Sequence, residues 1–269
     1  MNDGYAPSGS DWIYYREAGS GHPVVFIHAG VADSRMWLPQ LEAVPDGFRY
    51  IAFDQRGFGN SKVGGSKYNS YRDLLALMDY LDCDKAFLVG CSIGAGIALD
   101  VAIEAPKRVS GLVLVGADSP GFEPEEGPFE PPQWEEAVAA FKAGDYERVA
   151  QLDAEIWLGG HGRPLDQVDP DLRALFLEMD LYPLRSESER GELQTAGPDR
   201  EKAIRGIERP TLVMVGEYDM PDLQAAAHHL ASRLSKRSAV VIDDAAHLPG
   251  FEQPDAFNAA LVNFLETIA

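Results

Sequence analysis

Residues 86–96 read AFLVGCSIGAG, and the pattern G-x-S-x-G at 90–94 places Ser92 where a nucleophile would stand. An apolar run typical of a strand precedes this pattern, and a helix-forming segment follows it. Glycine at both flanking positions allows a tight turn, which would lift the Ser92 hydroxyl above the edge of a sheet. The amide of Ile93 would then begin the helix, where an unpaired N–H group favours negative charge such as a developing oxyanion. The sequence therefore predicts that Ser92 is a nucleophile.

A serine hydroxyl is a weak nucleophile unless a general base takes its proton, and the base needs a carboxylate to orient it. His247 follows the last apolar run of the chain, and Asp219 follows the run before it. Both would lie at the carboxyl edge of a parallel sheet, where ligands bind. Asp118, which follows the run at 112–116, is an alternative orienting acid. We expect Ser92, His247 and Asp219 to act together.

Short apolar runs alternate with segments of helical periodicity, and most of the runs are rich in Val, Ile and Leu, as in strands buried on both faces. The predicted strands are 12–16, 24–28, 50–53, 86–89, 112–116, 211–215 and 239–242, with another near 4–7 that forms a hairpin. The predicted helices between them are 68–81, 93–104, 222–234 and 255–267. This alternation predicts an α/β fold with a mostly parallel central sheet of about eight strands, flanked by helices.

One interval interrupts this alternation, because more than about ninety residues between the runs at 112–116 and 211–215 contain no predicted strand, too many for a loop. The interval opens with a connector rich in proline and glutamate at 120–132. Helical segments are predicted near 133–143, 146–157 and 171–179, and a polar stretch follows at 186–200. Their aromatic and leucine side chains recur at helical spacing, which gives the segment an apolar face to bury. We predict a helical cap domain, 119–206, inserted into a core domain of 1–118 and 207–269.

Composition limits the classes of partner. The formal net charge of −20 argues against nucleic acid and anionic membrane surfaces, both of which attract basic patches. The apolar runs are shorter than a membrane helix needs, and the N-terminus lacks the profile of a signal peptide. Cys83 and Cys91 have neither metal-site nor disulfide-framework spacing, so we expect a cytoplasmic protein with no metal and no cofactor. The expected partner is a small-molecule substrate, and the sequence does not distinguish a monomer from a homodimer.

Taken together, these motifs resemble the α/β-hydrolase superfamily, in its capped, cofactor-independent branch. The resemblance rests on His28-Ala29-Gly30, the loop Asp54-x-Arg56-Gly57-x-Gly59-x-Ser61, the pattern at 90–94, Asp219 and His247. It implies an oxyanion hole formed by the amides of Ile93 and Gly30. The turn reads His-Ala-Gly where this family usually has His-Gly. The tail that follows His247 is similar to that of 3-oxoadipate enol-lactone hydrolases.

The resemblance implies a serine hydrolase that cleaves a small carboxylic ester or lactone through an acyl-enzyme intermediate. The candidate substrate-binding residues of the cap are Trp134, Trp157, His161 and Phe122, although packing within the cap is the favoured explanation for each of them. Two alternatives remain. The same three residues could support carbon–carbon bond hydrolysis or perhydrolysis, and the fold could instead serve as a ligand-binding receptor.

Overall fold

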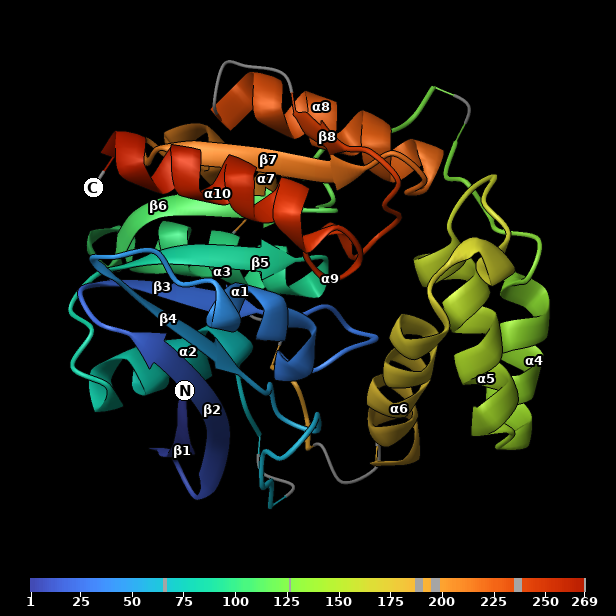
Figure 1. Ribbon diagram of the computed structural model, residues 1–269, viewed down its shortest axis with the longest axis horizontal. Coiled ribbons are helices and arrows are strands. Elements are labelled where there is room, and N and C mark those ends of the chain that lie inside the picture. The colour runs from blue at the N-terminus through green and yellow to red at the C-terminus, as the bar shows by residue number, and fades with distance from the viewer. Residues whose placement is uncertain (65–66, 126, 187–190, 195–198, 235–238, 269) are drawn as a thin grey trace.

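The structure is a computed structural model that describes residues 1–269 except 65–66, 126, 187–190, 195–198, 235–238 and 269. Within the described residues, eight strands form one sheet in the order β1-β2-β4-β3-β5-β6-β7-β8 (Figure 1). The strands are β1 (Asn2–Ser8), β2 (Asp11–Gly19), β3 (His22–Ile27), β4 (Phe48–Phe53), β5 (Ala86–Cys91), β6 (Val109–Val115), β7 (Thr211–Gly216) and β8 (Val240–Ile242). All neighbours from β4 to β8 pair in parallel, whereas the β1–β2 hairpin is antiparallel and joins β4 antiparallel. The predicted α/β fold is confirmed.

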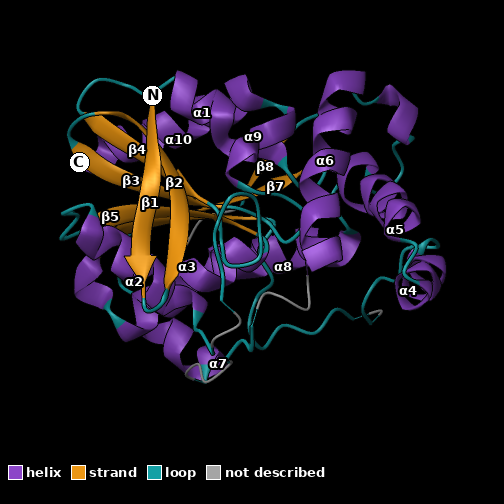
Figure 2. Cartoon of the chain, turned by 90° about the horizontal axis from the view of Figure 1, so that it is seen from below, coloured by secondary structure: helices purple, strands orange, loops and turns teal. Residues whose placement is uncertain are grey.

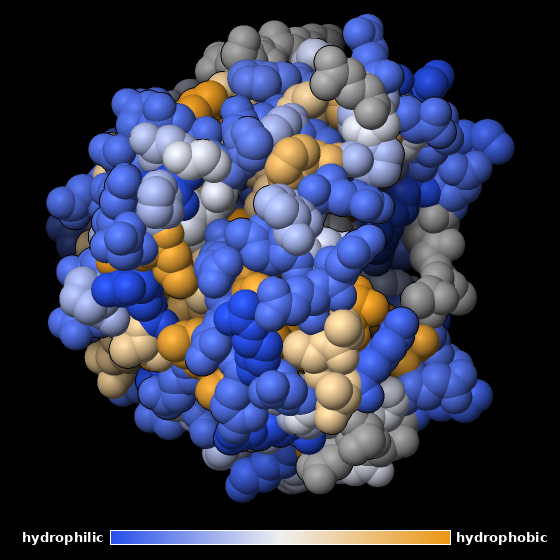
Figure 3. All heavy atoms as spheres, turned by 90° about the vertical axis from the view of Figure 1, so that its right-hand side faces the viewer, coloured by the Kyte–Doolittle hydropathy of each residue, from blue (hydrophilic) through white to orange (hydrophobic). Residues whose placement is uncertain are grey.

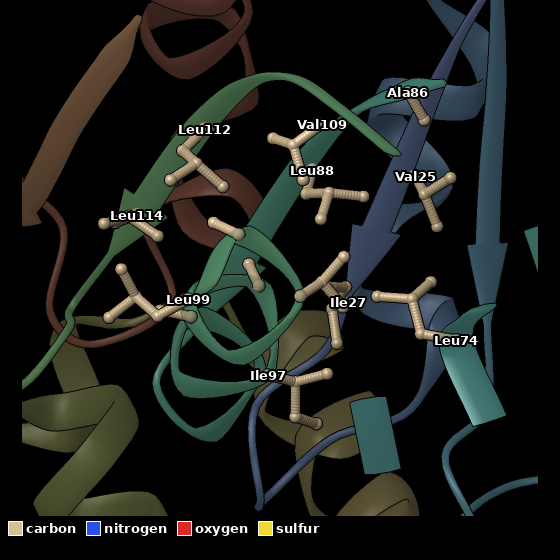
Figure 4. Packing of buried hydrophobic residues seen from close by; sticks show 14 of the residues in the cluster. Val25, Ile27, Leu74, Ala86, Leu88, Ile97, Leu99, Val109, Leu112 and Leu114 are labelled. Atoms are coloured by element: carbon tan, nitrogen blue, oxygen red, sulfur yellow. The ribbon is translucent and has the colours of Figure 1, made fainter. Parts of the chain in front are cut away.

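Helices cover both faces of the sheet. One face packs against α2 (Ser70–Tyr80), α3 (Ile93–Glu104) and α8 (Pro221–Leu234), and the other against α1 (Leu38–Glu42), α9 (Pro249–Glu252) and α10 (Pro254–Ile268). Val25 and Leu88 of the strands meet Leu74 and Ile97 of the helices in the first of these layers (Figure 4). Because successive strand residues point to opposite faces, the neighbouring Val24 lies in the second layer.

Three further helices lie beyond the carboxyl ends of the strands, apart from the two layers (Figure 1). They are α4 (Trp134–Ala143), α5 (Tyr146–Asp153) and α6 (Pro170–Ser186), and a π-helical turn, Ala154–Gly159, extends α5. The face they present is mostly hydrophilic, and its hydrophobic residues form separate groups (Figure 3). They account for the helical segments that we predicted in the long interval.

The boundaries of the cap domain stay a prediction. The short helix α7 (Arg200–Ala203) falls inside the predicted cap range of 119–206, yet it contacts α3 of the core and lies away from α4–α6 (Figure 2). Parts of the polar stretch at 186–200 fall outside the described residues. Within the described residues, none of the helices combines the length and the apolar character that crossing a bilayer requires.

Sequence periodicity missed several short elements, among them a 3₁₀ turn at Ser34–Trp37 and the helices α1, α7 and α9. Each has four or five residues, too few for an apolar stripe to repeat.

Candidate active site

Ser92 lies on a strained turn between β5 and α3, with φ of 54° and ψ of −117°. Its amide donates a hydrogen bond of 2.8 Å to the carbonyl of Val115 at the end of β6, which holds the turn against the sheet. A Cβ atom at Gly90 would lie 2.3 Å from the carbonyl oxygen of Gly94. A Cβ atom at Gly94 would lie 2.3 Å from the carbonyl oxygen of Ile27. Only glycine fits at either position, so the pattern G-x-S-x-G is a steric requirement of the turn.

His247 and Asp219 meet at the carboxyl edge of the sheet, in the loops that follow β8 and β7. His247 Nδ1–H donates to both carboxylate oxygens of Asp219, at 3.0 and 3.1 Å, and both side chains are buried. The amide of Met220 donates to Asp219 Oδ1 at 2.9 Å. A Cβ atom at Gly116 would stand 3.0 Å from the imidazole ring, so a larger residue there would push against the pair. The Asp219 contact orients the ring with Nδ1 protonated, which leaves Nε2 free to accept a proton.

The surroundings of His247 set its proton affinity. Burial alone lowers the pKa of His247, but the charge and hydrogen bond of Asp219, together with the charge of Glu252, raise it above the ordinary value of 6.5. A base whose pKa lies near the working pH combines a useful protonation state with a useful driving force for proton transfer.

Glu252 clamps the loop that carries His247. From α9, its carboxylate accepts the amides on both sides of the histidine, Ala246 at 2.9 Å and Leu248 at 3.0 Å. Arg163, from the segment between the π-helical turn and α6, forms a buried ion pair with this carboxylate. Arg163 also donates to the carbonyl of Asp244. Sequence reasoning missed both residues, because an ion pair between positions 163 and 252 leaves no periodic signal.

Trp157, in the π-helical turn, contacts His247 directly. The two rings lie 4.7 Å apart between centroids, and the carbonyl of Trp157 accepts the amide of His247 at 3.1 Å. Of the four predicted substrate-binding residues, Trp157 is the one that the structure brings to Ser92 and His247.

Ser92, His247 and Trp157 line one cavity of about 750 Å³. The rest of its described wall mixes apolar with polar and charged side chains, from Gln55, Asn69, Ser70, Tyr71, Ile93, Ile97, Leu99, Asp100, Asp118, Pro120, Leu193, Gln194, Arg200 and Leu223. Of these wall residues, only Ile93 and Asp118 had a role predicted from the sequence. The others come from the loop after β4, the connector after β6, the segment at 193–194 and the helices α2, α3, α7 and α8, which only the fold brings together.

Trp134, His161 and Phe122 require a correction, because none of them is among the described residues that line the cavity. Trp134 is 44% exposed at the start of α4, the outermost cap helix. His161 is exposed and contacts the ring of Phe129. Phe122 packs on His229 of α8, since the connector after β6 runs along that helix. The structure therefore brings none of these three residues to the cavity wall that it describes.

The turn after β3 lies against the serine turn. A Cβ atom at Gly30 would be 3.5 Å from the side chain of Ile93, so Gly30 and Ile93 are neighbours. Ile93 lines the cavity, and its amide stands at the first position of α3. His28 anchors this turn, because its Nε2 accepts the amide of Gln55 at 2.9 Å and its Nδ1–H donates to the carbonyl of Ala29. Gly30 therefore lies beside the residue that follows Ser92, and the oxyanion hole of the Ile93 and Gly30 amides stays a prediction.

Asp118, the alternative acid, is exposed, and its carboxylate accepts the amide of the next residue, Ser119. Asp219, not Asp118, is the carboxylate in contact with His247. Cys91, beside Ser92, is fully buried, and burial raises the pKa of its thiol, as suits a small apolar side chain. No group of three or more His, Cys, Asp or Glu side chains in the described part of the chain could hold a metal ion.

The chain is similar in sequence to known proteins. A family model of the alpha/beta hydrolase fold matches residues 22–254 of the chain. BpoC of Mycobacterium tuberculosis, whose name proposes a non-heme bromoperoxidase, is 30% identical over 285 aligned positions that cover 95% of this chain and 98% of BpoC.

Two solved structures share the fold over nearly the whole of both chains. An esterase from Thermogutta terrifontis superposes with a TM-score of 0.81 at 24% identity, covering 100% of this chain and 99% of the esterase. The enol-lactonase from Burkholderia xenovorans LB400 has a TM-score of 0.77 at 24% identity, covering 98% of this chain and all of the lactonase.

Proposed function

Because the chain belongs to the α/β-hydrolase family, we propose that it is a serine hydrolase that cleaves a small carboxylic ester or lactone. One observation carries the proposal. Ser92 lies on a strained turn in the same cavity wall as His247. The Nδ1 atom of His247 is hydrogen-bonded to the buried carboxylate of Asp219. These are the nucleophile, base and orienting acid that acyl transfer requires.

In the first half of the proposed reaction, Ser92 Oγ attacks the carbonyl carbon of the ester while His247 Nε2 takes the hydroxyl proton. The carbonyl oxygen becomes an oxyanion, which the amides of Ile93 and Gly30 bind. The tetrahedral intermediate collapses, the alkoxide leaves with the proton that His247 returns, and the acyl group stays on Ser92. Asp219 stabilises the imidazolium that forms on the way.

In the second half, a water molecule gives its proton to His247 Nε2 and attacks the acyl carbon. Collapse of this second intermediate returns the proton to Ser92 Oγ and releases the carboxylic acid. A lactone follows the same course, except that the alcohol and acid remain in one molecule.

The cavity and the relatives support a small substrate. A volume of about 750 Å³ falls within the range of small-molecule sites, roughly 300–1,000 Å³. Two proteins of the same fold are named as an esterase and an enol-lactonase. We propose that α4–α6 and the π-helical turn form the cap, and that Trp157 provides its contact with the substrate.

The test is hydrolysis of p-nitrophenyl acetate, butyrate and octanoate by the wild-type protein and by Ser92→Ala. We expect turnover that falls at least about 1,000-fold in the variant, because the nucleophile is lost. Ser119→Ala is the matched control, since Ser119 follows the neighbouring strand β6, is buried and hydrogen-bonds His229 outside the cavity.

Wild-type turnover no faster than that of Ser92→Ala on all three esters would contradict the proposal. Ring-fission ketones, peroxide-dependent oxidation and tight ligand binding without turnover would then be measured, because the same three residues could serve each of them.

A further inference from the structure

The cavity that Ser92 and His247 line also carries charged side chains in its described wall, and their arrangement determines which substrates it admits. Apart from His247, the charged side chains in its described wall are Asp100, Asp118 and Arg200. The uncharged polar groups around them, such as Gln55 and Asn69, leave the sign of the field to these three side chains.

Arg200 is paired with one of the two acids through two of its three nitrogens. Its Nε donates to Asp100 Oδ1 at 2.7 Å and its Nη2 donates to Asp100 Oδ2 at 2.6 Å, which is the two-pronged geometry that guanidinium and carboxylate groups favour. Asp100 is mostly buried on α3, whereas the Arg200 side chain is 44% exposed. A Cβ atom at Gly96 would be 3.5 Å from Arg200 Nη1, which places the guanidinium over the same helix. The pair has no net charge to offer a substrate.

Asp118 adds a carboxylate without a matching cation. Within the described residues Asp118 forms no ion pair, and its carboxylate accepts a hydrogen bond only from the amide of Ser119. The hydrogen bond and charge of Asp100 raise the pKa of the Arg200 guanidinium. The charge of Asp118 raises it further, so Asp118 lies near Arg200. When His247 is neutral and can act as a base, the described wall therefore holds two negative charges and one positive charge.

We propose that this cavity selects esters whose acyl group is uncharged or cationic and discriminates against acyl groups that end in a carboxylate. The proposal rests on the proposed ester hydrolysis. A substrate carboxylate would meet the field of Asp118 and would find Arg200 already occupied by Asp100. A cationic end would instead pair with Asp118. Because Asp118 is exposed, its field acts through water and weakens as salt is added, which the experiment below uses.

The experiment compares p-nitrophenyl hexanoate with two analogues whose chains end in a carboxylate (mono-p-nitrophenyl adipate) or in a trimethylammonium group. At about 10 mM salt, where screening is weak, we expect kcat/KM for the adipate ester about tenfold below that for hexanoate. The cationic ester should equal or exceed hexanoate. Raising the salt to about 1 M should compress these ratios, because the Debye length falls to about 3 Å.

Two variants then address the residues. Asp118→Asn removes the unmatched charge, so the adipate-to-hexanoate ratio should rise several-fold. Asp100→Asn frees the Arg200 guanidinium, so the adipate ester should become the better substrate of the two. Glu135→Gln, which removes an exposed charge on α4 outside the cavity wall, is the matched control and should leave the ratio unchanged. Reporting each variant as a ratio to hexanoate separates selectivity from a general loss of activity or folding.

Equal kcat/KM for the three esters at low salt, or a ratio that Asp118→Asn does not move, would overturn the proposal. If the hexanoate ester is not cleaved at all, the proposed function fails separately. The three compounds would then be compared as ligands of Ser92→Ala by calorimetry, where equal affinities would overturn the selectivity.

Discussion

The sheet core and the helical cap each bury an aspartate, and they offset the cost of burial in opposite ways. Asp219 in the core is matched with donors, because the imidazole N–H of His247 and the amide of Met220 both bond to it. Asp180 in α6 instead faces a second carboxylate, Asp153 of α5. Burial and the charge of Asp153 raise the pKa of Asp180 to about 9, so Asp180 holds a proton at neutral pH.

The difference follows from what each acid supports. The core needs a fixed negative charge beside a ring that becomes positive during the proposed reaction. The cap needs a rigid wall, and Asp153 hydrogen-bonds the side chain of Trp157, the residue that packs on His247. One acid acts through its charge, and the other acts through a retained proton that lets two carboxyl groups pack together.

Asp219→Asn is the strongest test of the core half of this comparison. We expect kcat/KM to fall about 1,000- to 10,000-fold with the fold intact, because an amide no longer holds the imidazole in its reactive tautomer. Asp222→Asn, three residues later, is the control, since its carboxylate accepts only backbone amides. A loss below about tenfold in Asp219→Asn would show that another acid orients His247.

Glu252→Gln tests the residue that joins core and cap. The charge of Glu252 raises the pKa of His247, so removing it should move the acid limb of the kcat/KM profile to lower pH. Arg163 would also lose its buried partner, at a cost of about 1–3 kcal/mol in unfolding free energy. Glu217→Gln, an exposed acid that bonds the amide of Asp244, is the control. An unmoved acid limb would contradict this role.

Asp180→Asn tests the cap half. The folded-state pKa of Asp180, about 9, lies above the ordinary value of 3.8, so the wild-type folded state binds a proton that the unfolded chain releases. This contribution to stability is present at low pH and is lost as pH rises toward 9. Asparagine keeps an N–H donor and does not ionise, so the melting temperature of the variant should gain on the wild type as the pH rises from about 4 to about 9. We expect a gain on the order of a few degrees.

Asp171→Asn, at the exposed start of the same helix, should show no such change with pH. A constant difference between Asp180→Asn and the wild type across this range would mean that the two carboxyl groups do not share a proton.

Trp134→Ala should have the smallest effect. Trp134 is 44% exposed and lies outside the described cavity wall, so we expect kcat/KM to change less than about twofold and stability by less than about 1 kcal/mol. Steady-state kinetics and thermal melting would check both. A large rise in KM would place the outer cap helix at the substrate after all.

Local sequence patterns singled out Ser92, Asp219 and His247 in the core. The turn at 90–94 is recognisable in the sequence because sterics require glycine at 90 and 94. Asp219 and His247 are recognisable because each follows the end of a strand. Such signals are short-range, or follow from the parallel order of strands. The fold class followed from the same alternation of apolar runs and helical periods.

The residues that link distant segments were invisible in the sequence for a physical reason. Arg163 and Glu252 pair across 89 positions, and Asp153 meets Asp180 only because α5 packs on α6. These charged residue types usually lie at the surface. They connect distant segments here because tertiary packing buries them. The two tryptophans of the cap show the same limit. Trp134 and Trp157 have similar predicted helical contexts, yet only one faces His247.

The contacts of the π-helical turn have a mechanical consequence. At this end several contacts hold the cap to the loops of the core, among them the Trp157 carbonyl, the His161 amide on Tyr218 at 2.7 Å, and the Arg163 bonds to Glu252 and Asp244. At its other end, the bridge from Arg35 to Glu178 of α6 is exposed. A cap held more strongly at one side would rotate about that side when it opens. We expect the cap to pivot at His247 and to admit substrate from the opposite edge, which leaves the proposed base undisturbed during each opening.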